Sequence, residues 1–269
     1  MLNKRGQLTI FIIIAAVIVG IGLLVFIFWP SINSLFMSEA QATELLASKI
    51  EPMRETIQSC VYPVAESILM DMGLKAGYYD TSHLFTINYA GDKVIVMYKD
   101  IYNNRINKLP SLQQVKDQFV LGLETEGYRQ IDSCIKDFAS YRRFFDVSLG
   151  RRELDLQFED DNVLVTFDWS ITISKKGASL VVSPTPAVVP LQFGRAWSVA
   201  NDIINYEVQQ INFETVADRY NWLKAANREH LKIDTMRYPT SNQVIYMITS
   251  IPFREHEKEF KFYFAVNRI

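Results

Sequence analysis

The sequence lacks the short motifs that mark common catalytic and nucleotide-binding sites. HExxH, GxSxG, GxGxxG and the Walker loop are all absent, and the chain contains only three histidines: His83, His230 and His256. His256 lies in a charged stretch, residues 254–258, for which a solvated turn is a better interpretation than a metal site with Glu255 and Glu257. The sequence therefore predicts no catalytic residue, no metal site and no cofactor, and we expect a protein that is not an enzyme.

An excess of positive charge is also missing. The 28 lysines and arginines are outnumbered by 30 aspartates and glutamates. Nucleic-acid binding requires a concentrated positive surface, so we expect no nucleic-acid partner. Glycine and proline are few, at 11 and 9 of 269 residues, whereas aromatic residues make up 13%. This composition is typical of a packed core rather than of a disordered chain. Because Asn-x-Ser/Thr is absent, N-glycosylation at that sequon is not expected.

Charge is missing altogether from the 21 residues between Leu8 and Phe28. A helix of this length spans about 30 Å, the hydrocarbon thickness of a bilayer. Lys4 and Arg5 precede it, and basic residues tend to remain in the cytoplasm. The sequence therefore predicts a basic leader at 1–7, a transmembrane helix at 8–28 and a cell-membrane protein. We expect its N-terminus to be cytoplasmic and the rest of the chain to lie outside.

A cleaved secretory signal is the alternative to a retained helix. Such signals have an apolar region of roughly 7–15 residues and a small-x-small cleavage site. The apolar run here is longer, and Trp29-Pro30-Ser31 supplies no such site. The retained membrane helix is therefore the favoured interpretation.

Residues 4–11, KRGQLTIF, resemble the processing site of archaeal type IV pilin-like precursors, which carry class III signal peptides. In that family a short basic leader ends in Gly, and cleavage follows it. The resemblance implies a prepilin-type peptidase as partner and cleavage between Gly6 and Gln7; an uncleaved anchor is the alternative. Thr9 fits the family pattern, but Phe11 stands where the family usually has a Glu associated with subunit registration. Insertion and orientation are thus implied more strongly than polymerisation.

The two cysteines, Cys60 and Cys134, are the only ones in the chain. In an oxidising exterior an even pair predicts one disulfide, and two unpaired buried thiols are the alternative. A metal site is the least favoured interpretation, because no CxxC or paired-His spacing accompanies them. Both cysteines occupy apolar positions of predicted helices, which suits a bond between two helices.

The first of these helices is predicted from Ser38 to about Met72, with Gly73 near its end. Its apolar stripe repeats every three or four residues and comprises Ile50, Met53, Ile57, Val61, Val64 and Ile68. Pro52 and Pro63 predict kinks or breaks. The stripe packs either on a neighbouring subunit or on the chain's own domain, and the second interpretation is favoured.

A second helical region begins at Pro110, with Ser111 as its expected N-cap. Its apolar positions are Leu112, Val115, Phe119, Leu123, Ile131, Cys134, Ile135 and Phe138, which places Cys134 on the inward face. Gly122 or Gly127 is expected to interrupt it. A third helix is predicted from Phe193 to Ile211, and residues 212–223 extend or restart it.

Period-two alternation predicts the strands. A hairpin is expected at 84–98 with a turn at 90–92. A sheet is expected from Leu154 to Ser183 with turns at 159–162 and 175–177. Three more strands, 231–236, 243–250 and 259–266, close a second sheet or extend the first. Residues 183–190 contain three prolines and are expected to be a connector. Before the first hairpin, Gly77-Tyr78-Tyr79 predicts a turn with exposed aromatic rings.

A wider resemblance includes the N-terminal motif, Cys60, Gly73, the Gly77-Tyr78-Tyr79 turn, Pro110 and Cys134. This arrangement is similar to a set of uncharacterised archaeal membrane-anchored proteins. Because that set has no assigned activity, the resemblance implies location and architecture rather than chemistry.

These observations predict an α+β protein with one N-terminal transmembrane helix that continues into a long helix, followed by antiparallel sheets with packed helices. We expect a membrane-proximal helical stalk at 29–73 and an extracytoplasmic domain at 74–269, with a sub-boundary near 184–190. The expected role is structural or adhesive, including that of a pilin-like subunit, with self-association or other surface proteins as partners. The alternative is a ligand-binding or sensor domain that acts through a partner, suggested by Tyr78, Tyr79 and Tyr98 near one hairpin.

Overall fold

The computed structural model describes most of the chain after residue 37. Its described residues are 14–15, 17–24, 26, 38–89, 91–98, 106–183, 185–209, 213, 222–223, 228, 230–237, 242–252 and 258–267. Those between 14 and 26 are helical and mostly exposed. Within the described part of the chain, no helix has both the length and the hydropathy of a membrane crossing. The predicted leader and span residues Lys4, Arg5, Gly6, Gln7, Leu8 and Phe28 lie outside the described residues.

Helix α2 (Glu39–Leu74) is the axis of the fold, and its 36 residues extend for about 54 Å. Ser38 caps it: the Ser38 hydroxyl accepts the Gln41 N–H, and the Gln41 side chain accepts the Ser38 N–H. The predicted long helix is thus confirmed. Its buried stripe packs on strands and helices of the same chain, as the favoured interpretation has it. Neither Pro52 nor Pro63 breaks the helix, because packing on its neighbours supports the turns that lack a hydrogen bond.

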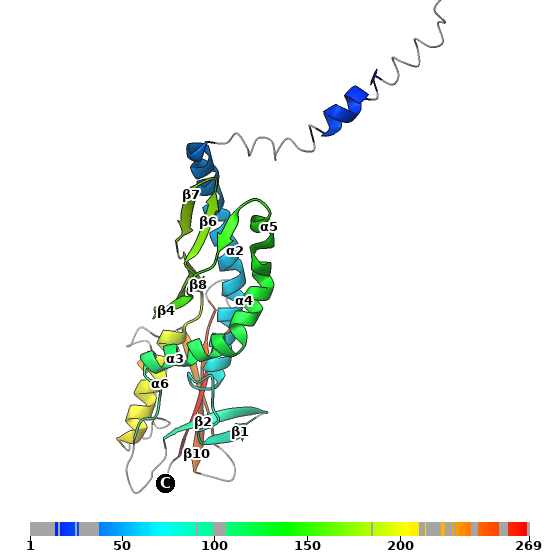
Figure 1. Cartoon of the computed structure of the whole chain (residues 1–269). Helices are drawn as coiled ribbons and strands as arrows, with labels where there is room; N and C mark the ends of the chain where they lie inside the picture. The colour runs from blue at the N-terminus through cyan, green and yellow to red at the C-terminus, as the bar shows by residue number, and fades with distance from the viewer. Residues whose placement is uncertain are drawn as a thin grey trace, which may run out of the picture.

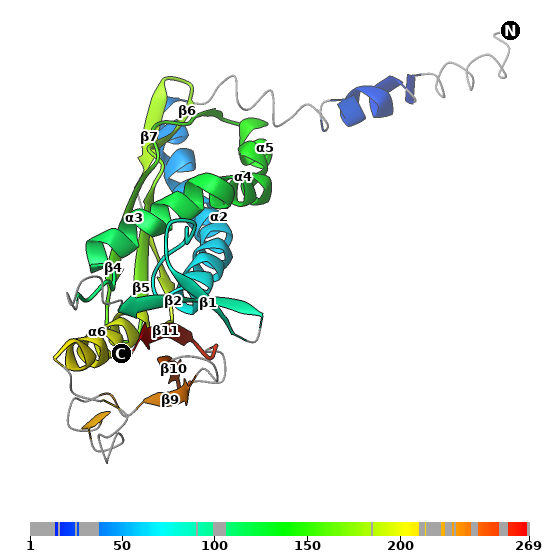
Figure 2. The ribbon, with the colours of Figure 1, turned by 90° about the horizontal axis from the view of Figure 1, so that it is seen from below.

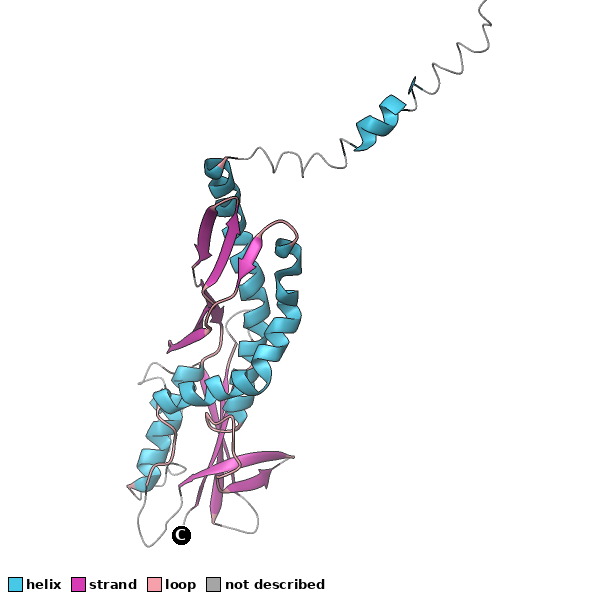
Figure 3. Ribbon diagram, viewed as in Figure 1, coloured by secondary structure: helices cyan, strands magenta, loops and turns pink. Residues whose placement is uncertain are grey.

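Six strands form a three-stranded antiparallel ribbon that is interrupted at one level along its length (Figures 1 and 3). They are β3 (Asp146–Ser148), β4 (Glu153–Phe158), β5 (Val163–Asp168), β6 (Ile171–Lys175), β7 (Ala178–Val182) and β8 (Thr185–Val189). The strand orders are β3-β6-β7 and β4-β5-β8. Short segments of the chain join β3 to β4, β5 to β6, and β7 to β8. The predicted sheet and its turns at 159–162 and 175–177 are confirmed.

The interruption has a local cause at Ser170. Its φ of +30° lies outside the extended region, and its N–H donates to the Asp168 carboxylate at 2.9 Å. The chain therefore changes direction between β5 and β6. Gly150, in the segment between β3 and β4, permits this, because a Cβ at that position would lie 2.8 Å from the Ser170 Cβ. Trp169 is buried at this corner.

The second helical region is a continuous run on the flank of α2. It consists of α3 (Leu112–Gly122), the π-helical turn η1 (Leu123–Gly127) and α4 (Tyr128–Ile135), followed by η2 (Lys136–Phe138) and α5 (Ala139–Arg142). Ser111 is the N-cap of α3, as predicted, and it forms a second capping box with Gln114. The expected interruption between Gly122 and Gly127 takes the form of the π-helical turn. A Cβ on Gly122 would lie 2.9 Å from the Tyr79 ring, so glycine allows close packing there.

A five-stranded sheet occupies the end of the molecule away from the start of α2 (Figure 1). Its order is β1 (Thr86–Tyr89), β2 (Asp92–Tyr98), β11 (Lys261–Asn267), β10 (Gln243–Ser250) and β9 (Leu231–Arg237). The predicted hairpin and the three C-terminal strands thus form one second sheet. Strands β2 and β11 pair in parallel, with Ala265 beside Val96, and the other pairs are antiparallel. Helix α6 (Phe193–Val208) packs on β10 and β11.

The prediction of a connector at 183–190 is wrong in one respect. This segment contains strand β8, which pairs with β5. Pro186 lacks an N–H, which an edge strand tolerates. Side chains of α2 hydrogen-bond to this edge. Arg54 Nε donates to the Ser183 carbonyl at 3.1 Å, and Gln58 Nε2 donates to the Pro186 carbonyl at 3.3 Å. Period-two patterning was hidden here by the prolines, and the pairing with β5 determines the structure.

The α+β class is confirmed, with antiparallel and mixed sheets. Buried side chains of α2, the helical run, the ribbon, α6 and the C-terminal strands form one continuous core. The start of α2, helix α5 and the turn between β6 and β7 lie together at one end, and the β1–β2 hairpin lies at the other (Figures 1 and 2). We call the first of these the proximal end.

Candidate functional site

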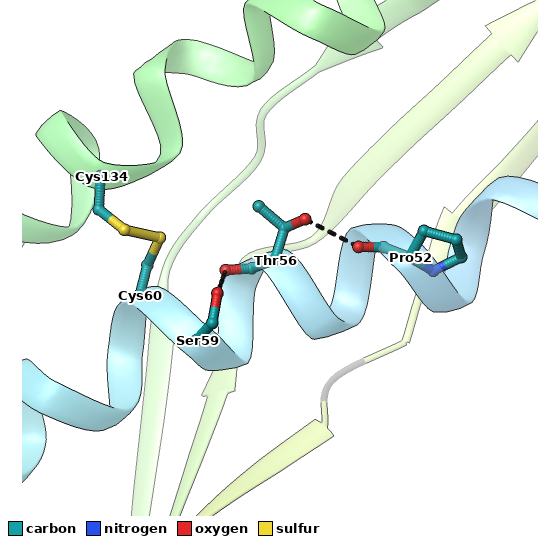
Figure 4. Close-up of a disulfide and its surroundings, with 5 residues drawn as sticks. All are labelled: Pro52, Thr56, Ser59, Cys60 and Cys134. Atoms are coloured by element: carbon teal, nitrogen blue, oxygen red, sulfur yellow. Dashed lines mark hydrogen bonds between the residues drawn. A yellow bond between two sulfur atoms is a disulfide. The ribbon is translucent and has the colours of Figure 1, made fainter.

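The predicted disulfide between Cys60 and Cys134 is confirmed. It joins α2 to α4, and its Cα atoms are 5.7 Å apart (Figure 4). This separation is typical of disulfides. Both cysteines of the chain are used, so no free thiol is left. The bond makes α2 and the helical run one covalent unit.

The inward placement predicted for Cys134 is wrong. Cys60 is only 3% exposed. Cys134 is exposed, although Ile131 and Ile135 on the same helix are buried. A step of three residues along an α-helix turns by about 300°. Cys134 therefore lies about 60° around the helix from Ile131. The disulfide therefore lies at the edge of the helix interface and is open to solvent on the α4 side.

An unusual backbone turn follows the disulfide directly. Lys136, Asp137 and Phe138 have φ values of 51°, 54° and 55°, and left-handed geometry costs a non-glycine residue about 1–2 kcal/mol. Arg142 stabilises the turn: Nε donates to the Asp137 carbonyl at 2.9 Å, and Nη2 donates to the Asp137 carboxylate at 3.2 Å. Phe138 is buried, with its ring centroid 5.7 Å from that of Trp169. Tertiary contacts therefore hold a conformation that the local sequence disfavours.

Arg152 links the same region to the interruption of the ribbon. Its guanidinium lies 4.0 Å from the centroid of the Trp169 ring and 5.0 Å from that of Tyr128. It also pairs with Asp132 at 2.6 Å. Cation–π contacts and a hydrogen-bonded ion pair thus join the ribbon to α4. The sequence analysis did not identify Arg152, because these partners are brought together only by the fold.

An open groove of about 370 Å³ lies beside α5 at the proximal end. Its lining comprises Lys49, Pro52, Thr56, Ile135, Phe138, Ser140, Tyr141, Phe144 and Phe145. Phe144 is 58% exposed, although the other phenylalanines of this lining are buried. The groove is thus an aromatic surface with a lysine at its margin. The run Tyr141-Arg142-Arg143-Phe144-Phe145 was the sequence signal that could have identified it.

A second groove of about 440 Å³ lies along α6 and is more polar. Asp202, Asn205, Tyr206, Gln209, Trp222 and Arg228 line it. Arg228 pairs with Asp202 at 2.6 Å and donates to the Ser198 hydroxyl at 2.7 Å. The arginine is therefore neutralised by its neighbour, and it supports the α6 surface.

The buried carboxylates are held by hydrogen bonds. Glu66 in α2 accepts hydrogen bonds from the Lys258 ammonium and the Tyr62 hydroxyl. The bond to Glu66 raises the pKa of Lys258, and burial, followed by the charge of Glu66, raises the pKa of Tyr62. Glu207 in α6 accepts from the Tyr246 hydroxyl at 2.6 Å. These contacts tie α2 to the segment before β11, and α6 to β10. Within the described ranges, no group of three or more His, Cys, Asp or Glu residues could hold a metal ion.

The tyrosines that suggested a binding rim serve mainly in packing. Tyr78 and Tyr79 are half-buried. The Tyr78 hydroxyl donates to the Lys108 carbonyl at 3.1 Å, and the Tyr79 N–H donates to the Gln118 side chain at 3.0 Å. The expected exposed aromatics are therefore wrong for these two residues. The side chain of Tyr98 and the whole of His256 lie outside the described residues.

No family model matches this chain, and neither a curated protein nor a solved structure is significantly similar to it.

Proposed function

We propose that this chain is a single-span cell-surface protein with a structural or adhesive role, including that of a pilin-like subunit. The Cys60–Cys134 disulfide is the observation that carries this proposal. Disulfides persist in oxidising compartments and are rare in the cytosol. Cys134 is exposed, so a reducing environment would have direct access to the bond. The bond therefore supports a location outside the cell for the fold that begins at Ser38.

The N-terminal sequence supports the same topology. The uncharged run from Leu8 to Phe28 has the length of a membrane span, and Lys4 and Arg5 favour a cytoplasmic N-terminus. Nine residues, 29–37, then separate the run from Ser38. In this topology α2 would extend away from the membrane, with the proximal end nearest to it.

The packing favours a structural role over ligand binding. The long helix α2, its disulfide and the continuous core give a stiff rod that would hold the five-stranded sheet away from the anchor. The half-buried Tyr78 and Tyr79 weaken the sensor alternative, because they were its main support. Partners in this role would be other surface proteins or further copies of the chain.

Protease treatment of intact cells tests the topology. We expect an added protease to digest the domain beyond Ser38 while a cytoplasmic marker protein stays intact, because the domain lies outside. Immunoblotting with antibodies against the C-terminal strands measures this. Protection of the domain until the cells are lysed would refute the proposed orientation.

Processing of the leader is a separate prediction. If a prepilin-type peptidase acts after Gly6, the mature chain begins at Gln7, and Gly6→Leu retains the leader. Intact-mass spectrometry of the purified protein measures the difference. Gly20→Leu, which changes a glycine inside the predicted span, is the matched control and should be processed normally. A native chain that still begins at Met1 or Leu2 would be an uncleaved anchor.

A further inference from the structure

We propose that the proximal end of the domain binds the anionic headgroups of the membrane that holds the chain. The inference rests on the proposed span. The surface concerned, the proximal face, consists of Arg142, Arg143, Phe144, Lys175 and Lys176. These residues come from two segments of the chain, 142–146 and 174–178.

The proximal face is basic although the chain as a whole is acidic. Its two segments contain four lysines and arginines against one acidic residue, Asp146. Asp137, which lies outside the two segments, is paired with Arg142. Arg143 and Lys176 are both exposed. Glu39 and Glu44 also belong to this end, on the first turns of α2, and they reduce the local excess without reversing it.

The fold brings the two segments together. Asp146 pairs with Ser174 across β3 and β6, so the residues before β3 lie beside the turn that follows β6. The Lys175 ammonium lies 5.1 Å from the centroid of the Phe145 ring. Lys176 and Gly177 form the turn itself, with φ values of 52° and 85°. The turn lies at the end of the ribbon (Figures 1 and 2), and Lys176 within it is exposed.

Phe144 gives the face an apolar anchor among the cations. It is 58% exposed and borders the groove beside α5. An exposed phenylalanine can insert its ring at the boundary between headgroups and acyl chains, and lysines and arginines are attracted to anionic lipids. The left-handed turn at 136–138 and its Arg142 contacts direct α5 and the following residues to this end. A strained turn that presents Arg143 and Phe144 at the proximal end fits this role.

The length of the tether makes the contact feasible. Residues 29–37 connect the predicted span to Ser38, and nine residues extend over at most about 30 Å. A surface tethered this closely meets the membrane at an effective concentration in the millimolar range. A few basic residues and one aromatic ring are then enough, because each cation needs only to approach within a Debye length of about 8 Å.

Photocrosslinking of the full chain tests the contact. A p-benzoylphenylalanine replaces Phe144, and the protein is reconstituted in vesicles of phosphatidylglycerol and phosphatidylcholine. We expect lipid adducts by mass spectrometry after illumination. In the matched control, p-benzoylphenylalanine replaces Phe85 instead. Phe85 is 50% exposed and lies beside the β1–β2 hairpin at the opposite end. Adducts at position 144 should exceed those at position 85 by roughly tenfold.

Charge dependence separates lipid binding from mere proximity. Arg143→Glu combined with Lys176→Glu should reduce the adducts at position 144 several-fold, as should pure phosphatidylcholine or about 0.5 M NaCl, which shortens the Debye length to about 4 Å. Lys93→Glu, an exposed lysine of β2, is the matched control and should change nothing. An unchanged unfolding transition verifies that each variant is folded.

The outcomes distinguish this inference from the topology. Release of the chain from vesicles by alkaline carbonate would refute the span and the lipid contact together. If the chain stays in the vesicles but gives equal adducts at positions 144 and 85, the lipid contact alone is refuted. The same conclusion follows if the adduct yield does not depend on the charge of the lipid. Crosslinks from position 144 to a second copy instead of lipid would likewise overturn it and assign the face to protein contact.

Discussion

Replacing both cysteines, as Cys60→Ser with Cys134→Ser, is expected to lower the free energy of unfolding by about 4 kcal/mol. The bond closes a loop with a sequence separation of 74 residues, and the loss follows from the greater entropy of the unfolded chain without it. The replacement also buries a serine hydroxyl at position 60, which is 3% exposed in the native protein. The bond between α2 and α4 is therefore a principal source of stability in this fold.

Urea unfolding of the purified full-length chain, followed by tryptophan fluorescence, measures this loss. Ser133→Ala is the matched control, because Ser133 is an exposed neighbour of Cys134 and should change stability by less than about 0.5 kcal/mol. Reduction of the native protein should reproduce most of the loss without releasing the protein from the membrane. A double variant within about 1 kcal/mol of the native protein would show that packing alone holds α2 to α4.

Phe193→Ala is expected to destabilise the protein by about 3–5 kcal/mol. Phe193 is fully buried at the first turn of α6, where the helix meets the ribbon and the five-stranded sheet. Its ring centroid lies 5.3 Å from that of Phe158 in β4, 5.5 Å from that of Phe260 and 5.8 Å from that of Phe262 in β11. Removing the ring leaves a cavity between three elements, and the surrounding rings are held by their own strands.

Phe144→Ala is the matched control for this loss. It removes the same number of atoms from a side chain that is 58% exposed, so the expected change in detergent solution is below about 1 kcal/mol. Urea unfolding monitored by circular dichroism compares the two variants. Equal losses for both would mean that the junction around Phe193 is not the close-packed centre that the ring distances indicate.

The sequence by itself determined the elements whose signals are local. Ser38 and Ser111 are each followed three residues later by glutamine, and both begin helices with a capping box. Alternating apolar residues identified the ribbon strands β4, β5, β6 and β7, and the strand Gln243–Ser250 was placed with its observed bounds. The disulfide could also be predicted, because two cysteines leave only one possible pairing. In each case a few neighbouring residues contain the information.

Only the tertiary structure decided which elements meet. The parallel pairing of β2 with β11 joins residues more than 160 positions apart, such as Val96 and Ala265, and nothing in either strand specifies its partner. Pro186 argued for a connector, but pairing with β5 and hydrogen bonds from α2 make that segment a strand. The left-handed turn at 136–138 is locally unfavourable and persists because Arg142 and the buried core around Phe138 stabilise it. Local patterns report the energy of a segment alone, whereas these features depend on contacts that exist only once the whole chain has folded.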